Sequence, residues 1–187
     1  MNFKSISAAK AAALVGICAA TLECVKLALT FIPNFEAVTL FTALYGYVFG
    51  WFGVISTIIF VFAEMLIYGI NTWVVLYFIY WPLVAVVFLL LAKMRVKNRW
   101  LLSAVAVLMT VFFGILSALI EVGLFLGSLD NFFYRFAVYY ARGIVFYIVQ
   151  IVGNAVLFPL LFNYLADKLV KIKPRMLKYT SNKEGDV

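Results

Sequence analysis

Long runs of apolar residues, separated by a few short polar segments, dominate this chain of 187 residues. Hydrophobic residues make up 67% of the sequence and charged residues only 12%, whereas a soluble domain is about 45–50% apolar and about 25% charged. The chain has too few polar side chains to cover the surface of a water-soluble fold of this size. Its natural surrounding is therefore a lipid bilayer, and the sequence predicts an all-α membrane protein.

A spanning helix needs about 20 mainly apolar residues, and the chain has room for about six of them. The first apolar run is longer than the core of a cleavable signal peptide, so we expect it to be retained as a helix. The last run exceeds what a bilayer needs and is expected to continue into the cytoplasm. The expected spans are residues 9–32, 37–49, 52–68, 73–92, 100–126 and 133–169. They form one transmembrane domain, 1–173, followed by a polar cytoplasmic tail, 174–187.

Basic residues gather in three segments: before the first span, between the fourth and fifth spans, and after the sixth. The positive-inside rule places all three segments in the cytoplasm. Six transmembrane helices with both the N- and C-termini cytoplasmic satisfy this rule without conflict, and an odd number of spans does not. Membrane orientation thus explains the net charge of +7, and no nucleic acid partner is needed to account for it.

The absence of histidine excludes several kinds of site. Histidine is the commonest general base and a frequent metal ligand, so a Ser-His-Asp triad, a His-liganded zinc site and a haem-His site are ruled out. No glycine-rich phosphate loop occurs. Cys18 and Cys24 are about 9 Å apart by helical rise alone, which is beyond disulfide reach. We expect no catalytic residue and no metal site; an intramembrane enzyme that uses Glu64 or Glu121 as acid or base is the alternative.

Most ionisable residues within the expected spans lie at one depth. A charge at membrane depth costs at least ~2.5–3.5 kcal/mol, so it normally faces protein or water. With the orientation above, these residues fall in the outer halves of the spans, and the inner halves carry almost none. The pattern predicts a polar-lined cavity open to the outside. The alternative is structural ion pairing, either between Glu23 and Lys26 or between Glu64 or Glu121 and an arginine.

The last span carries a polar face. Spacings of three, four and seven to eight residues place its members on one side of a helix. These residues are Arg135, Tyr139, Arg142, Phe146 and Gln150. The face begins at the expected outer end of the span, so we expect it to line the same cavity.

The inner half of the first span has small side chains. Ala9 and Ala13 form an AxxxA pair, and Gly16 and Ala20 form a second small-xxx-small pair. Such faces allow helices to approach closely in lipid. We expect this face either to pack within the protein or to dock a partner near the cytoplasmic side.

Taken together, these features resemble the substrate-binding (S) components of energy-coupling factor transporters, which import vitamins into bacteria. The AxxxA pair lies in the helix where that family carries it. Three further segments resemble one branch of the family, which we identify with its cobalamin-type members: IPNFEAVTLFTALYGYVFG (32–50), FAEMLIYGINTW (62–73) and YFIYWPL (77–83). The resemblance covers most of the chain.

The resemblance implies a protein of the plasma membrane without enzymatic activity or a covalently bound cofactor. It would bind cobalamin or another vitamin (pantothenate, folate or a precursor) from outside, beneath a gating loop at residues 31–36. It would dock on a transmembrane coupling subunit with two cytoplasmic ATPases and then reorient in the membrane. A stand-alone permease or assembly factor is the alternative. The expected docking residues are Ala9, Ala13, Gly16 and Ala20. The expected substrate-binding residues are Asn34, Glu36, Glu64, Asn71, Trp73, Glu121, Arg135, Tyr139 and Arg142.

Overall fold

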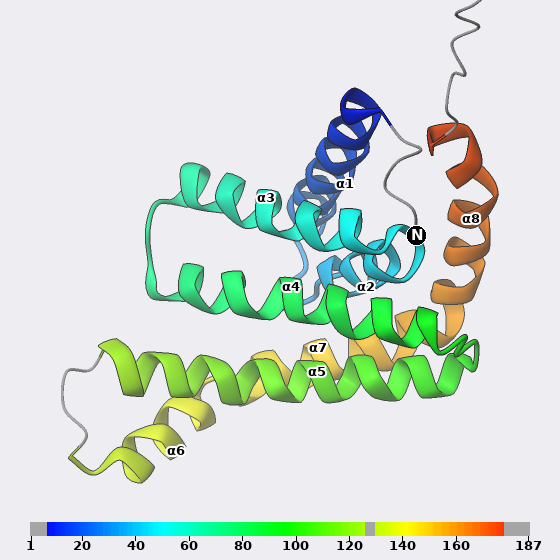
Figure 1. The fold of residues 1–187 in the computed structure, drawn as a ribbon. Helices are drawn as coiled ribbons and strands as arrows, with labels where there is room; N and C mark the ends of the chain where they lie inside the picture. The colour runs from blue at the N-terminus through cyan, green and yellow to red at the C-terminus, as the bar shows by residue number, and fades with distance from the viewer. Residues whose placement is uncertain (1–6, 126–129, 178–187) are drawn as a thin grey trace, which may run out of the picture.

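A computed structural model describes residues 7–125 and 130–177, and every regular element in these residues is a helix (Figure 1). The elements are α1 (Ala8–Ala28), α2 (Val38–Phe49), α3 (Trp51–Tyr68), α4 (Thr72–Lys93), α5 (Arg99–Ile120), η2 (Glu121–Phe125), α6 (Phe132–Arg142), α7 (Ile144–Leu157), η3 (Phe158–Phe162) and α8 (Asn163–Leu177). The two η elements are π-helical turns. The sequence expectation of an all-α fold is confirmed for the described residues.

Within residues 7–125 and 130–177, five helical segments are long and apolar enough to cross a membrane. They are α1, α3, α4, α5 with η2, and the segment Ile144–Pro174. Helix α2 is also apolar but has only 12 residues, fewer than the roughly 17–25 that a spanning helix needs. The described helices therefore have the lengths and the composition of a multi-pass helical membrane protein.

Short polar and glycine signals set the ends of the helices. The Ser7 side chain accepts a hydrogen bond from the Lys10 N–H at the start of α1, and the Asn98 side chain accepts two from the first turn of α5. These contacts satisfy backbone donors that have no partner within the helix. Gly50, with φ of 67°, separates α2 from α3, and Gly69, with φ of 81°, ends α3. Both need the left-handed region that glycine enters without strain.

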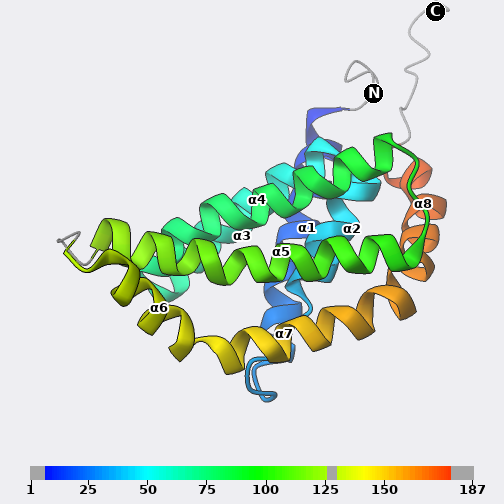
Figure 2. The same ribbon diagram turned by 90° about the horizontal axis from the view of Figure 1, so that it is seen from below.

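Helices α3, α4 and α5 lie side by side, and α7 lies along α5 (Figures 1 and 2). Helix α2 packs against both α3 and α4, while α1 packs mainly on α3. In both views α1 and α8 run across the direction of α4 and α5. The loop that follows α1 lies beside α7, as Figure 2 shows.

The expected single helix over residues 133–169 is wrong, because the chain bends at Gly143 and again near Pro159. At Gly143 a Cβ atom would lie 2.5 Å from the Tyr147 ring, so the ring occupies the space that any other residue would need. Pro159 lacks the N–H of a regular helical turn, and the chain forms a π-helical turn there. Arg135, Tyr139 and Arg142 consequently lie on α6, separate from the polar residues of α7.

Polar contacts hold the basic segments together at one end of the bundle. The Tyr47 hydroxyl donates to the Val96 carbonyl at 2.7 Å, and the Asn163 amide donates to the Lys97 carbonyl at 3.0 Å. The Lys173 ammonium donates to the Val48 carbonyl. The basic α4–α5 loop and α8 are thereby joined through α2.

Two sequence expectations extend beyond what the structure describes. Leu126, the last residue of the expected fifth span, lies outside the described residues, as do residues 178–187 of the expected tail. The first residues of that tail are helical, because α8 continues to Leu177.

Candidate ligand-binding cavity

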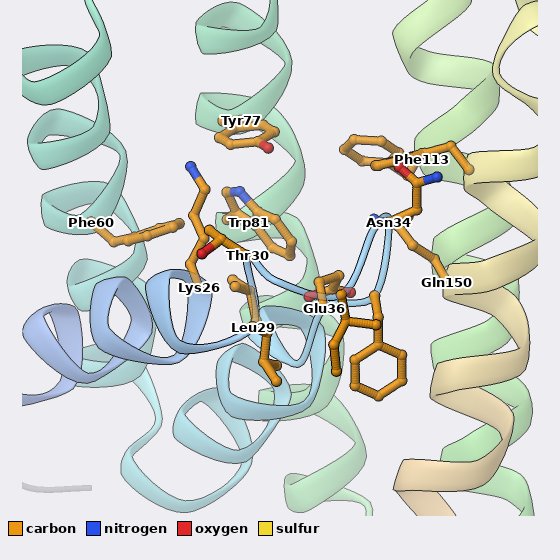
Figure 3. Close-up of a pocket in the computed structure, with 14 residues that line it drawn as sticks. Lys26, Leu29, Thr30, Asn34, Glu36, Phe60, Tyr77, Trp81, Phe113 and Gln150 are labelled. Carbon is orange, nitrogen blue, oxygen red and sulfur yellow. The ribbon is translucent and has the colours of Figure 1, made fainter.

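A cavity of about 190 Å³ lies between the loop after α1 and helices α3, α4, α5 and α7 (Figure 3). Its lining is mainly apolar, with a few polar and charged groups. The lining residues are Lys26, Leu29, Thr30, Ile32, Asn34, Phe35, Glu36, Val38, Phe60, Tyr77, Trp81, Phe113, Phe146 and Gln150. Apolar walls with a few convergent polar groups are the usual composition of a small-molecule site.

Aromatic rings form one side of the cavity. The ring of Trp81 contacts those of Tyr77 and Phe60, with centroids 5.5 and 6.3 Å away. The Trp81 side chain is only 5% exposed, and its indole N–H has no hydrogen-bond partner in the described residues. A buried donor without a partner costs about 1–3 kcal/mol. Trp81 thus lines the cavity and carries a donor that no described residue uses.

The loop between α1 and α2 forms another side of the cavity. Two tight turns shape it, since the Ile32 N–H donates to Leu29 and the Phe35 N–H donates to Ile32. Asn34 lies within the second turn with φ of 62°, a left-handed conformation that asparagine tolerates better than most residues. The ring of Phe35 lies against Gly153, where a Cβ atom would be 3.1 Å from it. Glycine on α7 thus allows the loop to close down on that helix.

Glu36 joins this loop to the first turn of α2. Its carboxylate accepts hydrogen bonds from the Thr39 N–H at 2.9 Å and from the Thr39 hydroxyl at 2.6 Å. Burial raises the pKa of the Glu36 carboxyl above its ordinary value of 4.5, while the hydrogen bonds from Thr39 act in the opposite direction. Since the raising effect is larger, the folded state holds the Glu36 proton more tightly than the unfolded chain does.

This difference predicts a pH dependence of stability. A carboxyl with a raised pKa in the folded state favours folding below its unfolded pKa, and this contribution is lost as pH rises through the folded pKa. We expect the free energy of unfolding of the wild type to fall, relative to that of Glu36→Gln, as pH rises from about 4.5. Unfolding in detergent micelles, followed by circular dichroism across pH for both proteins, measures the difference. A constant difference would contradict the assignment.

Lys26 lies at the edge of the cavity and forms an ion pair with Glu64, across the α1–α3 interface. The side chains of Lys26 and Glu64 are 28% and 0% exposed. Three aromatic rings surround the Lys26 ammonium, with centroids 4.5 Å (Tyr68), 5.7 Å (Trp73) and 5.9 Å (Tyr77) away. Each ring presents its electron-rich face to the cation. Lys26 thus pairs with a neighbouring helix, whereas the sequence suggested pairing with Glu23.

Four of the nine expected substrate-binding residues come together here. Asn34 and Glu36 line the cavity, and Glu64 and Trp73 contact Lys26. The structure does not bring the other five to the lining of this cavity. These are Asn71, at the start of α4, Glu121, in η2, and Arg135, Tyr139 and Arg142, on α6. The break at Gly143 accounts for the last three.

Sequence reasoning missed most of the aromatic lining. Phe60, Tyr77, Trp81 and Phe113 lie within apolar runs where many aromatic residues face lipid or core. The spacing of four between Tyr77 and Trp81 was a usable signal, because it places both rings on one face of α4. Gln150, which the sequence assigned to the polar face of the last span, does line the cavity.

The small-residue face of α1 points away from the packed side of that helix. The opposite face is buried, through Leu14, Cys18, Ala19 and Leu22. No described atom outside the helix backbone lies within 4 Å of where a Cβ of Gly16 would be. The four expected docking residues are all exposed: Ala9, Ala13, Gly16 and Ala20.

No protein-family model, curated protein or solved structure matches this chain. The class to which it belongs is therefore defined by its fold and composition alone. It is a helical protein with several helices able to cross a membrane and a partly polar cavity between them.

Proposed function

We propose that this chain is the substrate-binding component of an importer of the energy-coupling factor type, and that it carries a vitamin. The observation that carries the proposal is the cavity roofed by the α1–α2 loop, with Asn34 and Glu36 in its lining. This is the loop that the resemblance implies as the gate. The ligand enters from outside beneath the loop, and the protein performs no chemistry on it.

The size of the cavity bears on the choice of vitamin. Its volume of about 190 Å³ is below the ~300–1,000 Å³ typical of sites for drug-sized ligands. A ligand as large as cobalamin requires residues 29–37 to move away from α7. A smaller vitamin or precursor needs less rearrangement, so we place it first and cobalamin second.

The exposed small residues of α1 support docking on a coupling subunit with two cytoplasmic ATPases. Ala9 and Ala13 present little side chain, so another helix can approach the α1 backbone closely in lipid. An exposed AxxxA face that none of the described helices covers suits a partner that binds and releases. Docking there would precede reorientation of the chain in the membrane.

The test is co-purification of the tagged protein from its native membrane, with mass spectrometry of bound proteins and small molecules. We expect a membrane coupling subunit, two ATPases and one vitamin-like compound. Ala13→Trp should lower the amount of co-purified coupling subunit and ATPases at least tenfold. The small molecule should stay bound. Ala155→Trp, on the exposed side of α7, is the matched control and should retain both. Recovery of the wild type alone, without partner or ligand, would overturn the proposal.

A further inference from the structure

The α1–α3 interface holds two carboxyl groups whose hydrogen-bonding needs the described residues do not meet. Glu64 is 0% exposed; its Oε2 atom receives the Lys26 ammonium, and its Oε1 atom is buried with no partner. Both carboxylate oxygens of Glu23 are also buried without a donor. The Glu23 carboxyl, on α1, interacts with the Glu64 carboxyl across the same interface. Three buried oxygens of these two carboxyl groups therefore have no N–H or O–H donor among the described residues.

The charges around this pair do not balance. Among the described residues, Lys26 is the one cation that acts on both carboxyls. The other titratable groups facing the pair are the phenols of Tyr68 on α3 and Tyr77 on α4, which bring no positive charge. On α2, Tyr45 faces Thr21 and Cys18 instead. Two ionised carboxylates and one ammonium would leave a net negative charge within a helical segment able to span a membrane, where an unbalanced charge is costly.

A proton resolves both problems better than a metal ion does. Two carboxyl groups in contact cannot both ionise cheaply, and a proton held by one can be donated to the other as a hydrogen bond. A metal ion would have to sit beside the Lys26 ammonium, which repels it. We propose that Glu23 and Glu64 share one exchangeable proton, so that with Lys26 they form a neutral proton-binding site between α1 and α3.

The proton site and the cavity share one residue. Lys26 lines the cavity and also forms the ion pair with Glu64. A second proton on the carboxyl pair would release the Lys26 ammonium, which would then be available to an anionic group in the cavity. Binding of an anionic ligand at Lys26 should accordingly be accompanied by proton uptake. This last consequence rests on the proposed function, whereas the proton site itself does not.

Infrared difference spectroscopy of the purified protein in lipid nanodiscs tests the site directly. A protonated carboxylic acid has a C=O stretching band, separate from the carboxylate bands, that shifts in D2O. The experiment is done in the Glu36→Gln background, so that Glu36 contributes no band. At neutral pH we expect a band equivalent to one carboxylic acid. Either Glu23→Gln or Glu64→Gln should abolish it, because the remaining carboxylate then pairs with Lys26 in full.

Two further variants make the result specific. Lys26→Met should about double the band, since both carboxyl groups lose their cation and each then holds a proton. Glu121→Gln removes an acidic residue of η2 and should leave the band unchanged. The proposal is overturned if the background protein shows no such band at neutral pH, or if the band survives in both glutamine variants. Because no ligand or partner is needed, this outcome is independent of whether the transport proposal holds.

Discussion

Replacing Lys26 with methionine should lower the free energy of unfolding by about 3–5 kcal/mol, the usual cost of leaving one member of a buried ion pair without its partner. Glu64 is fully buried and has no other cation in the described residues. This loss of stability includes the free energy needed to protonate Glu23 and Glu64, which have no cation once Lys26 is removed. Reversible unfolding in mixed micelles, followed by circular dichroism, measures the change. A loss that is complete at neutral pH and smaller at acidic pH would identify the uncompensated carboxyls as its source.

Two further proteins separate the charge effect from the loss of a lysine as such. Lys93→Met removes an exposed lysine at the end of α4 and should change stability by no more than about 0.5 kcal/mol. The double variant Lys26→Met, Glu64→Leu replaces the ion pair with apolar side chains, and such replacements are often neutral or stabilising. We expect it to recover much of the loss, and Glu23, which is left without its cation, accounts for the remainder. If Lys26→Met were as mild as Lys93→Met, the ion pair would not be present in the membrane.

Hydropathy predicts which residues form the long helices, but it does not show where an apolar run leaves the helix. The first span was expected to reach residue 32, yet α1 ends at Ala28 and the chain turns. Phe31 and Ile32 are 89% and 51% exposed in that turn. Both are as apolar as helix residues, so only the tertiary position of the loop distinguishes them. Gly50 and Gly69, in contrast, do mark the ends of helices. Their positive φ angles are favoured by glycine itself, so the sequence alone indicates them.

The residues of the candidate site likewise fall into those that the sequence identifies and those that depend on tertiary packing. Asn34 and Glu36 were identifiable because they are polar residues at a turn between two apolar runs. The partner of Glu64 was not identifiable, since pairing with Lys26 depends on how α1 packs on α3. The residues of α6 were assigned to the cavity on the assumption of a continuous helix. The pattern of polar and apolar residues does not show that the helix breaks at Gly143, where the Tyr147 ring fills the space that a Cβ atom would need.

Replacing Gly46 with alanine should prevent α2 from packing on α4. A Cβ atom at this position would lie 2.1 Å from the Ala85 carbonyl oxygen and 2.7–2.8 Å from two further backbone atoms of Ala85. Backbone atoms cannot rotate away as a side chain does, so the two helices must separate. We expect a loss of about 3 kcal/mol or more, at or above the upper end of the usual range for overpacking. The loss should outweigh the gain of about 1 kcal/mol from better helix propensity.

Gly16→Ala provides the matched control, because it makes the same chemical change within a helix where the added methyl group meets nothing. No described atom outside the local helix backbone lies within 4 Å of its Cβ position. Only the higher helix propensity of alanine then changes the stability. The variant should be as stable as the wild type or more stable by up to about 1 kcal/mol. The two variants should therefore move stability in opposite directions in the same unfolding assay. Equal stability of both would mean that α2 and α4 do not make the close contact that positions the α1–α2 loop over the cavity.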